Sequence, residues 1–253
     1  MSTIGILYPG HSAEDDYPWV EGVLHEAGYA VRLPVVHTSV GEDAHRVDAL
    51  LDLGGAARLA EGADRVTAGA PCDALVWACT SGSFVFGWEG AHEQVAGLAE
   101  RTGLPTTSTS LAFVRAAQRL GLRRVAVAAS YPHDVAAAFV TFLGRAGIEV
   151  TALGSHDILT AAEVGTLGRE EVLALAGGVD RTGAQAVLVP DTALHTLPWL
   201  EDLEAGLGTV VLTANQVSLH DGLALLGEVP PVAGLGRLFA TAHEGARTAG
   251  TPR

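Results

Sequence analysis

Short apolar runs of the β type alternate along the chain with longer segments of helical spacing. Eight such runs occur, at residues 4–9, 30–36, 73–78, 105–109, 124–130, 148–154, 186–190 and 209–214. Between them, apolar residues recur every three or four positions, as in VRAAQRLG, AFVTFLGRAG and VSLHDGLALLG, which indicates helices packed on a sheet. Gly121, Gly147 and Gly227 stand where these helices are expected to end. The alternation predicts an α/β fold with parallel sheets.

The two halves of the chain repeat the same order of elements. Tyr8-Pro9 and Tyr131-Pro132 each end a predicted strand, and ALVWACTS (74–81) matches AVLVPDTA (186–193). The second match puts Cys79-Thr80 and Asp191-Thr192 at equivalent strand-to-helix turns.

The repeat predicts two Rossmann-like lobes, each with a four-stranded parallel sheet, related by a pseudo-two-fold axis. Residues 1–112 plus 216–253 are expected to form the first lobe, and residues 113–215 the second. Ligands bind at the carboxyl ends of strands in open parallel sheets, so the active site is expected between the lobes.

Composition narrows the function. The 15 basic residues are all arginine, which excludes lysine Schiff-base enzymes and P-loop nucleotide binding. A net charge of −14 without a basic cluster argues against nucleic acid and membrane partners, and a homo-oligomer is left open. The start of the chain does not resemble a signal peptide, and Cys72 and Cys79 are the two cysteines, so a cytoplasmic location is expected.

Cys79 is the strongest candidate for chemistry. It follows a buried strand and precedes TSGS, so its thiol is expected beside a helix N-terminus, a location that favours a thiolate. The N–H groups of this turn, with the Thr80 and Ser81 hydroxyls, could bind a carboxylate or a developing enolate. The alternative is a small buried hydrophobic residue, and that interpretation is preferred for Cys72, which stands where a loop enters the same strand.

The sequence resembles the aspartate/glutamate racemase superfamily, and within it the branch of maleate cis-trans isomerases and arylmalonate decarboxylases. The resemblance rests on ACTSGSFVFG (78–87), residues 102–135, VPDTALHTLPWLEDLE (189–204) and GLGRLF (234–239). It implies the two-lobed fold and catalysis of a small carboxylate substrate without cofactor or metal. It also implies that Cys79 and Asp191 are the catalytic positions and that the substrate site includes Pro9, Thr80, Ser81, Tyr131 and Thr192.

The chain departs from this family at the second turn. Racemases and maleate isomerases of the family carry a cysteine in both lobes, and the decarboxylase carries one in the second lobe alone. Here Cys79 lies in the first lobe and Asp191 stands where the second cysteine would be. An aspartate with a pKa of about 3.9 is a poor base for a weakly acidic C–H, so racemisation is disfavoured. Decarboxylation would need Asp191 to donate a proton, and therefore a raised pKa.

Isomerisation of a cis-enedioate fits best, because a Cys79 thiolate could add to the double bond and give a carbanion delocalised into a bound carboxylate. Asp191 could act as an acid, could repel a second carboxylate, or could only cap the following helix. A carboxylate-binding protein that has lost its catalytic pair remains the alternative outside the enzymes.

Two other features have an ordinary interpretation. The histidines, among them His37, His45 and His195, lack metal-ligand spacing, so no metal site is expected. The acidic run AEDDY (13–17) is expected to be a solvated loop and helix start.

Overall fold

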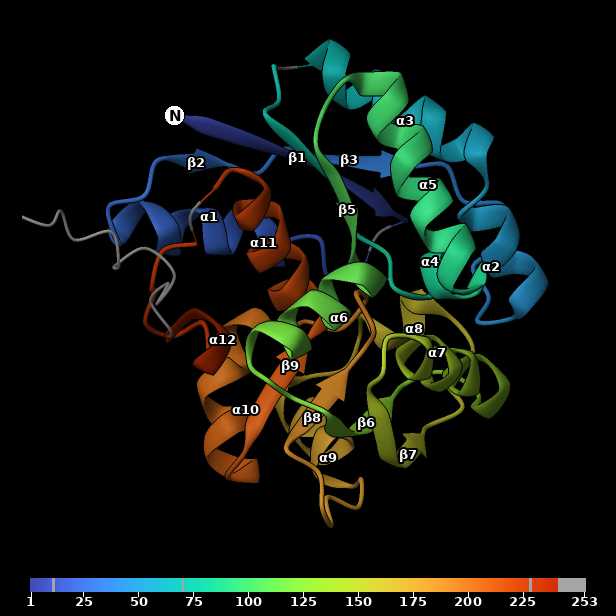
Figure 1. Ribbon diagram of the computed structural model, residues 1–253, viewed down its shortest axis with the longest axis vertical. Helices are drawn as coiled ribbons and strands as arrows, with labels where there is room; N and C mark the ends of the chain where they lie inside the picture. The colour runs from blue at the N-terminus through green and yellow to red at the C-terminus, as the bar shows by residue number, and fades with distance from the viewer. Residues whose placement is uncertain (11, 70, 228, 241–253) are drawn as a thin grey trace, which may run out of the picture.

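The computed structural model describes residues 1–10, 12–69, 71–227 and 229–240, and this part of the chain contains two parallel sheets with alternating helices (Figure 1). The first sheet comprises β1 (Ser2–Pro9), β2 (Val31–Arg32), β3 (Val35–Thr38), β4 (Ala74–Trp77) and β5 (Thr106–Ser108). The second comprises β6 (Arg124–Ala129), β7 (Glu149–Ser155), β8 (Ala186–Val189) and β9 (Val210–Thr213). Their orders are β2-β1-β4-β5, with β3 also paired to β1, and β7-β6-β8-β9. The described strand pairs are parallel, which confirms the predicted α/β class.

The first sheet has five described strands, so the prediction of four in that lobe is wrong. The predicted strand at 30–36 is divided into β2, which pairs with the start of β1, and β3, which pairs with its end. Pro34 lies between them and has no N–H to donate to a strand ladder, although its carbonyl accepts a 2.9 Å bond from Ile6 N–H. β1 is therefore paired along that edge by two short strands.

Helices cover both faces of the first sheet. α3 (Ala56–Gly69) and α5 (Gly87–Thr102) lie on one side, and α1 (Asp16–Glu26) and α11 (Ala214–Leu225) on the other (Figure 1). The other described helices are α2 (Val47–Leu53), α4 (Ser81–Phe84), α6 (Thr109–Arg119), α7 (His133–Arg145), α8 (Ala161–Val164), α9 (Arg169–Gly177), the short 3-10 helix η1 (Leu197–Trp199), α10 (Leu200–Leu207) and α12 (Arg237–Ala240). Gly121, Gly147 and Gly227 follow α6, α7 and α11 with positive φ, as predicted. Within the described residues, none of these helices combines the length and apolar character needed to cross a membrane.

α11 connects the two sheets. It follows β9 of the second sheet and packs against β4, β5 and α6 beside the first. Its residues from Ala214 to Leu223 are buried, and one apolar core cluster contains residues of both sheets. The predicted lobe boundary near residue 112 falls inside α6, and residues 241–253 lie outside the described residues, so the division into lobes stays a prediction.

Candidate active site

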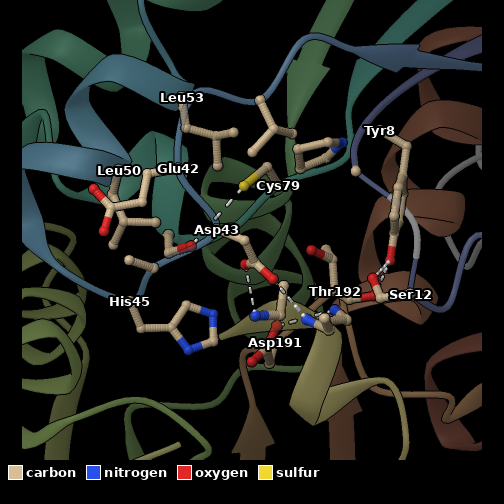
Figure 2. A pocket seen from close by; sticks show the side chains of 18 residues that line it. Tyr8, Ser12, Glu42, Asp43, His45, Leu50, Leu53, Cys79, Asp191 and Thr192 are labelled. Carbon is tan, nitrogen blue, oxygen red and sulfur yellow. Dashed lines mark hydrogen bonds between the residues drawn. The ribbon is translucent and has the colours of Figure 1, made fainter. Parts of the chain in front are cut away.

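A cavity of about 300 Å³ lies where the ends of β1, β4 and β8 meet the irregular segment 39–46 (Figure 2). Five of the predicted site residues line it: Pro9, Cys79, Ser81, Asp191 and Thr192. The other two, Thr80 and Tyr131, are fully buried and are not among the lining residues. The two catalytic candidates of the sequence analysis therefore share one cavity.

The Cys79 thiol lies in the turn between β4 and α4. Its Sγ accepts a hydrogen bond from Gly82 N–H at 3.3 Å and lies 3.9 Å from Ser81 Oγ. Space at position 82 is limited, because a Cβ there would lie 3.1 Å from the same sulfur. The turn thus places one N–H and one hydroxyl beside the sulfur, and a side chain at position 82 would require the sulfur or the turn to shift.

Burial decides the protonation state of this thiol, whose side chain is 3% exposed. Burial raises the pKa of Cys79 to about 12; the Asp191 carboxylate acts in the same direction, and the hydrogen bonds from Gly82 and Ser81 oppose it. The expectation that this location favours a thiolate is therefore wrong. α4 has only four residues, and the N–H groups at its start lower the pKa of the thiol less than the loss of hydrating water raises it.

Asp191 is buried, and its carboxylate is held by neutral donors. Ser130 donates its hydroxyl proton to Oδ2, and Ala193 N–H donates to Oδ1 at 2.9 Å. Asp191 lies in the connection from β8 to the next helical element, as expected, but η1 begins only at Leu197, so the alternative of a helix cap is wrong. Asp191 closes a turn of its own loop instead.

Two tyrosines related by the internal repeat hold this loop. Tyr8 Oη donates to Thr192 O at 2.7 Å, and Tyr131 Oη donates to Pro190 O at 2.6 Å. Burial raises the pKa of both phenols, so they remain neutral donors. The hydroxyl of Tyr131, expected to bind a substrate carboxylate, is engaged by the protein backbone.

The two neighbouring hydroxyls differ in their access to the cavity. Thr80 Oγ1 is buried with no hydrogen-bond partner of ordinary geometry among the described residues, although it and Ser81 lie near enough to the Tyr131 phenol to lower its pKa. Ser81 lines the cavity and Thr80 does not. Of the two hydroxyls, Ser81 is the one with direct access to a ligand.

The segment 39–46 closes one side of the cavity and reaches the second sheet. Asp43 accepts hydrogen bonds from Ala161 N–H at 2.8 Å and Ala162 N–H at 3.0 Å, at the start of α8. His45 Nδ1 donates to Ile158 O at 2.8 Å, and its ring packs edge-on against Tyr131 with a centroid distance of 4.9 Å. Figure 2 shows His45 and Tyr8 on different sides of the cavity.

Asp16 makes a second bridge between the sheets, and it corrects the interpretation of the acidic run 13–17. α1 begins at Asp16, but this side chain is 2% exposed rather than solvated. It accepts hydrogen bonds from Thr196 N–H at 3.1 Å, Leu197 N–H at 3.3 Å and Asn215 Nδ2 at 3.0 Å. Burial raises the pKa of Asp16, and these donors lower it.

Sequence reasoning missed several polar residues that line the cavity: Tyr8, Ser12, Glu42, Asp43 and His45. Tyr8 could have been found, because the repeat pairs it with Tyr131. The others lie in irregular loops that have no counterpart in the repeat. Within the described ranges, no group of three or more His, Cys, Asp or Glu side chains is placed to hold a metal ion.

The known proteins to which the chain is similar include an arylmalonate decarboxylase and a maleate isomerase. A sequence model of the arylmalonate decarboxylase family matches residues 56–239. The arylmalonate decarboxylase of Bordetella bronchiseptica is 32% identical over 148 residues, which cover 55% of this chain and 60% of that protein's length. The maleate isomerase of Geobacillus stearothermophilus is 26% identical over 178 residues, covering 68% of this chain and 70% of the isomerase.

Solved structures show the same fold. The maleate cis-trans isomerase of Nocardia farcinica, as a cysteine-to-serine mutant with a covalently bound succinylcysteine intermediate, superposes with a TM-score of 0.85 at 22% identity. The superposition covers 94% of this chain and 98% of the isomerase. The two-lobed α/β arrangement expected from the internal repeat is therefore confirmed.

Proposed function

Because the chain belongs to the arylmalonate decarboxylase family, we propose that it is a cofactor-independent isomerase that converts a small cis-2-enoate into its trans isomer through Cys79. The observation that carries the proposal is the arrangement of the cavity, where one thiol lies among hydrogen-bond donors and a carboxylate takes the place of a second thiol. A single nucleophile suffices for addition and elimination at a double bond activated by a carboxylate. A two-base racemase needs a second group able to remove a weakly acidic proton.

The reaction begins with ionisation of the Cys79 thiol, whose proton passes to water and is taken up again when the free thiol re-forms after turnover. The Cys79 sulfur adds to the alkene carbon, the π electron pair moves to the adjacent carbon, and the substrate carboxylate delocalises it. Rotation about the new single bond follows, and the pair re-forms the double bond as the C–S bond breaks. The Ser81 hydroxyl and the Gly82 N–H, which lie at the sulfur, stabilise the thiolate at both ends of this cycle.

The raised pKa of Cys79 favours a second candidate, a decarboxylase of malonate-type acids. A thiol that stays protonated is a suitable acid, because it can give its proton to the carbanion left when carbon dioxide departs. The matching relative from Bordetella bronchiseptica is named arylmalonate decarboxylase. In this reaction Cys79 would be a proton donor and would form no bond to carbon.

Proton NMR in deuterium oxide separates the candidates. Maleate, the monoamide of maleate, substituted malonates and amino acids are each incubated with the full chain. The isomerase converts a cis-enoate to the trans isomer and need not place solvent deuterium on carbon. Loss of carbon dioxide with one deuterium gained would identify the decarboxylase, and α-deuterium exchange in an amino acid would identify a racemase.

Turnover is expected to depend on one of the two cysteines. Cys79→Ser should abolish activity, because a hydroxyl keeps the shape but does not ionise in the accessible pH range. Cys72→Ser is the matched control and should retain nearly full activity, since Cys72 lies ahead of β4, outside the cavity lining. Equal losses in the two variants, measured as kcat/KM with folding checked by Tm, would contradict the role of Cys79.

A further inference from the structure

The cavity lining is acidic. Its carboxylates are Glu42, Asp43 and Asp191, while arginine is missing from the lining formed by the described residues and the sequence contains no lysine. The other titratable side chains in the cavity lining are Tyr8, His45 and Cys79. A ligand with two carboxylates would therefore meet neither arginine nor lysine among these lining groups.

Hydrogen-bond partners distinguish the three carboxylates. Glu42 accepts two bonds from the Arg46 guanidinium, each 3.1 Å long, and Arg46 also pairs with Asp48, so this cation offsets the charge of Glu42 in part. The donors to Asp43 are backbone N–H groups at the start of α8. Those to Asp191 are a hydroxyl and a backbone N–H. Neutral donors stabilise a carboxylate but leave its negative charge acting on the cavity.

The charge of Asp191 acts on the groups around it. It contributes to the raised pKa of Cys79, Tyr8 and Tyr131, which come from three different strand ends. Asp191 is 3% exposed, so water screens this charge poorly. The same field would repel a second carboxylate of the substrate and attract a positive group.

We propose that the substrate carries one carboxylate and, at its other end, a cationic nitrogen that pairs with Asp191. This inference rests on the proposed function and specifies its substrate class as an ammonium-bearing cis-2-enoate. The carboxylate lies toward Ser81 and activates the double bond for Cys79. The ammonium group offsets the charge of Asp191, which also removes part of the penalty for ionising the thiol.

Three saturated acids of similar length test the proposal without any reaction: glutarate, butyrate and 4-aminobutyrate. Their Kd values for the full chain are measured by ligand-observed NMR at low ionic strength. We expect 4-aminobutyrate to bind at least tenfold more tightly than glutarate, with butyrate between them. Asp191→Asn should reduce this ratio at least tenfold by weakening 4-aminobutyrate and strengthening glutarate, because it removes the charge and retains the shape.

Asp202→Asn is the matched control, since it removes an equal charge from an exposed ion pair with Arg169, outside the cavity lining. It should leave the ratio unchanged. Glutarate binding as tightly as 4-aminobutyrate to the parent chain, or an equal effect of both variants, would overturn the inference. Because these probes cannot accept a thiol, their binding is independent of catalysis. The expected ratio together with no isomerisation of cis-4-aminobut-2-enoate would contradict the proposed function alone.

Discussion

Cys79 illustrates how the surroundings of one residue control its reactivity. With a raised pKa of about 12, the thiolate fraction should increase about tenfold for each unit of pH well beyond pH 9. Alkylation of Cys79 by iodoacetamide, followed by mass spectrometry in a Cys72→Ser background, should show this rise without a plateau between pH 8 and about 10. Asp191→Asn should shift the profile to lower pH, since that carboxylate raises the pKa. A plateau near pH 8 would show that the thiol is not desolvated in solution.

The shared location of the two candidate catalytic residues could be predicted from the sequence, but their environment could not. The match of ALVWACTS with AVLVPDTA was enough to place Cys79 and Asp191 in one cavity. Burial of the thiol depends on packing between the two sheets and on the segment 39–46. No local pattern in the sequence indicates either of these contacts. The same limit explains Asp16, whose acidic sequence context gave no sign that backbone donors from the second half of the chain would bury it.

At the scale of elements, α5 positions the turn that contains Cys79. Gln94 Nε2 donates to Gly54 O at 2.8 Å and to Gly82 O at 2.9 Å, which ties the end of α2 to α4. The two backbones approach so closely that a Cβ at Gly54 would lie 2.0 Å from Gly82 O. Gln94 therefore fixes the residue whose N–H donates to the Cys79 sulfur.

Replacing Gln94 tests this positioning role. Gln94→Leu should leave two carbonyls unpaired, at a cost of about 1–3 kcal/mol in stability. It should also slow alkylation of Cys79 at a fixed pH by roughly tenfold, because a misplaced Gly82 N–H no longer stabilises the thiolate. Glu93→Leu, at an exposed neighbouring position on α5, controls for changes in the helix itself. If both variants lose stability equally and Cys79 reacts at the parent rate, Gln94 has no positioning role.

The strands themselves were largely predictable, because apolar runs buried on both faces leave a clear signal in the sequence. The run at 30–36 was predicted as one strand, which is wrong for a specific reason. Its apolar residues continue across Leu33 and Pro34, but the proline interrupts the ladder and leaves β2 and β3 as separate strands. The loop after β8 was misinterpreted for a different reason. DTALHTLPW resembles a helix start, but its first six residues, 191–196, precede the single turn of η1 without helical structure.

For the whole molecule, two sets of hydrogen bonds join the sheets on either side of the cavity. On one side Asp43 and His45 bind residues 158–162, and on the other Tyr8 and Asp16 bind residues 192–197. The first set is more exposed to solvent, and exposed hydrogen bonds open locally at a lower free energy than buried ones. We therefore expect access to Cys79 to be controlled from the side of the segment 39–46.

A double replacement of Asp43 and His45 by alanine should open that side. It removes the side-chain bonds to α8 and to Ile158, and the ring that packs on Tyr131, while the backbone bond from His45 N–H to Leu159 O and the bonds of Asp16 remain. Alkylation of Cys79 should become at least about tenfold faster at a given pH, because the buried thiol becomes accessible without global unfolding, and Tm should fall only slightly. Asp48→Ala, which breaks an exposed ion pair with Arg46 just beyond the segment, should leave the rate unchanged. An unchanged rate in the double variant would mean that the cavity opens elsewhere, at the contacts of Tyr8 and Asp16.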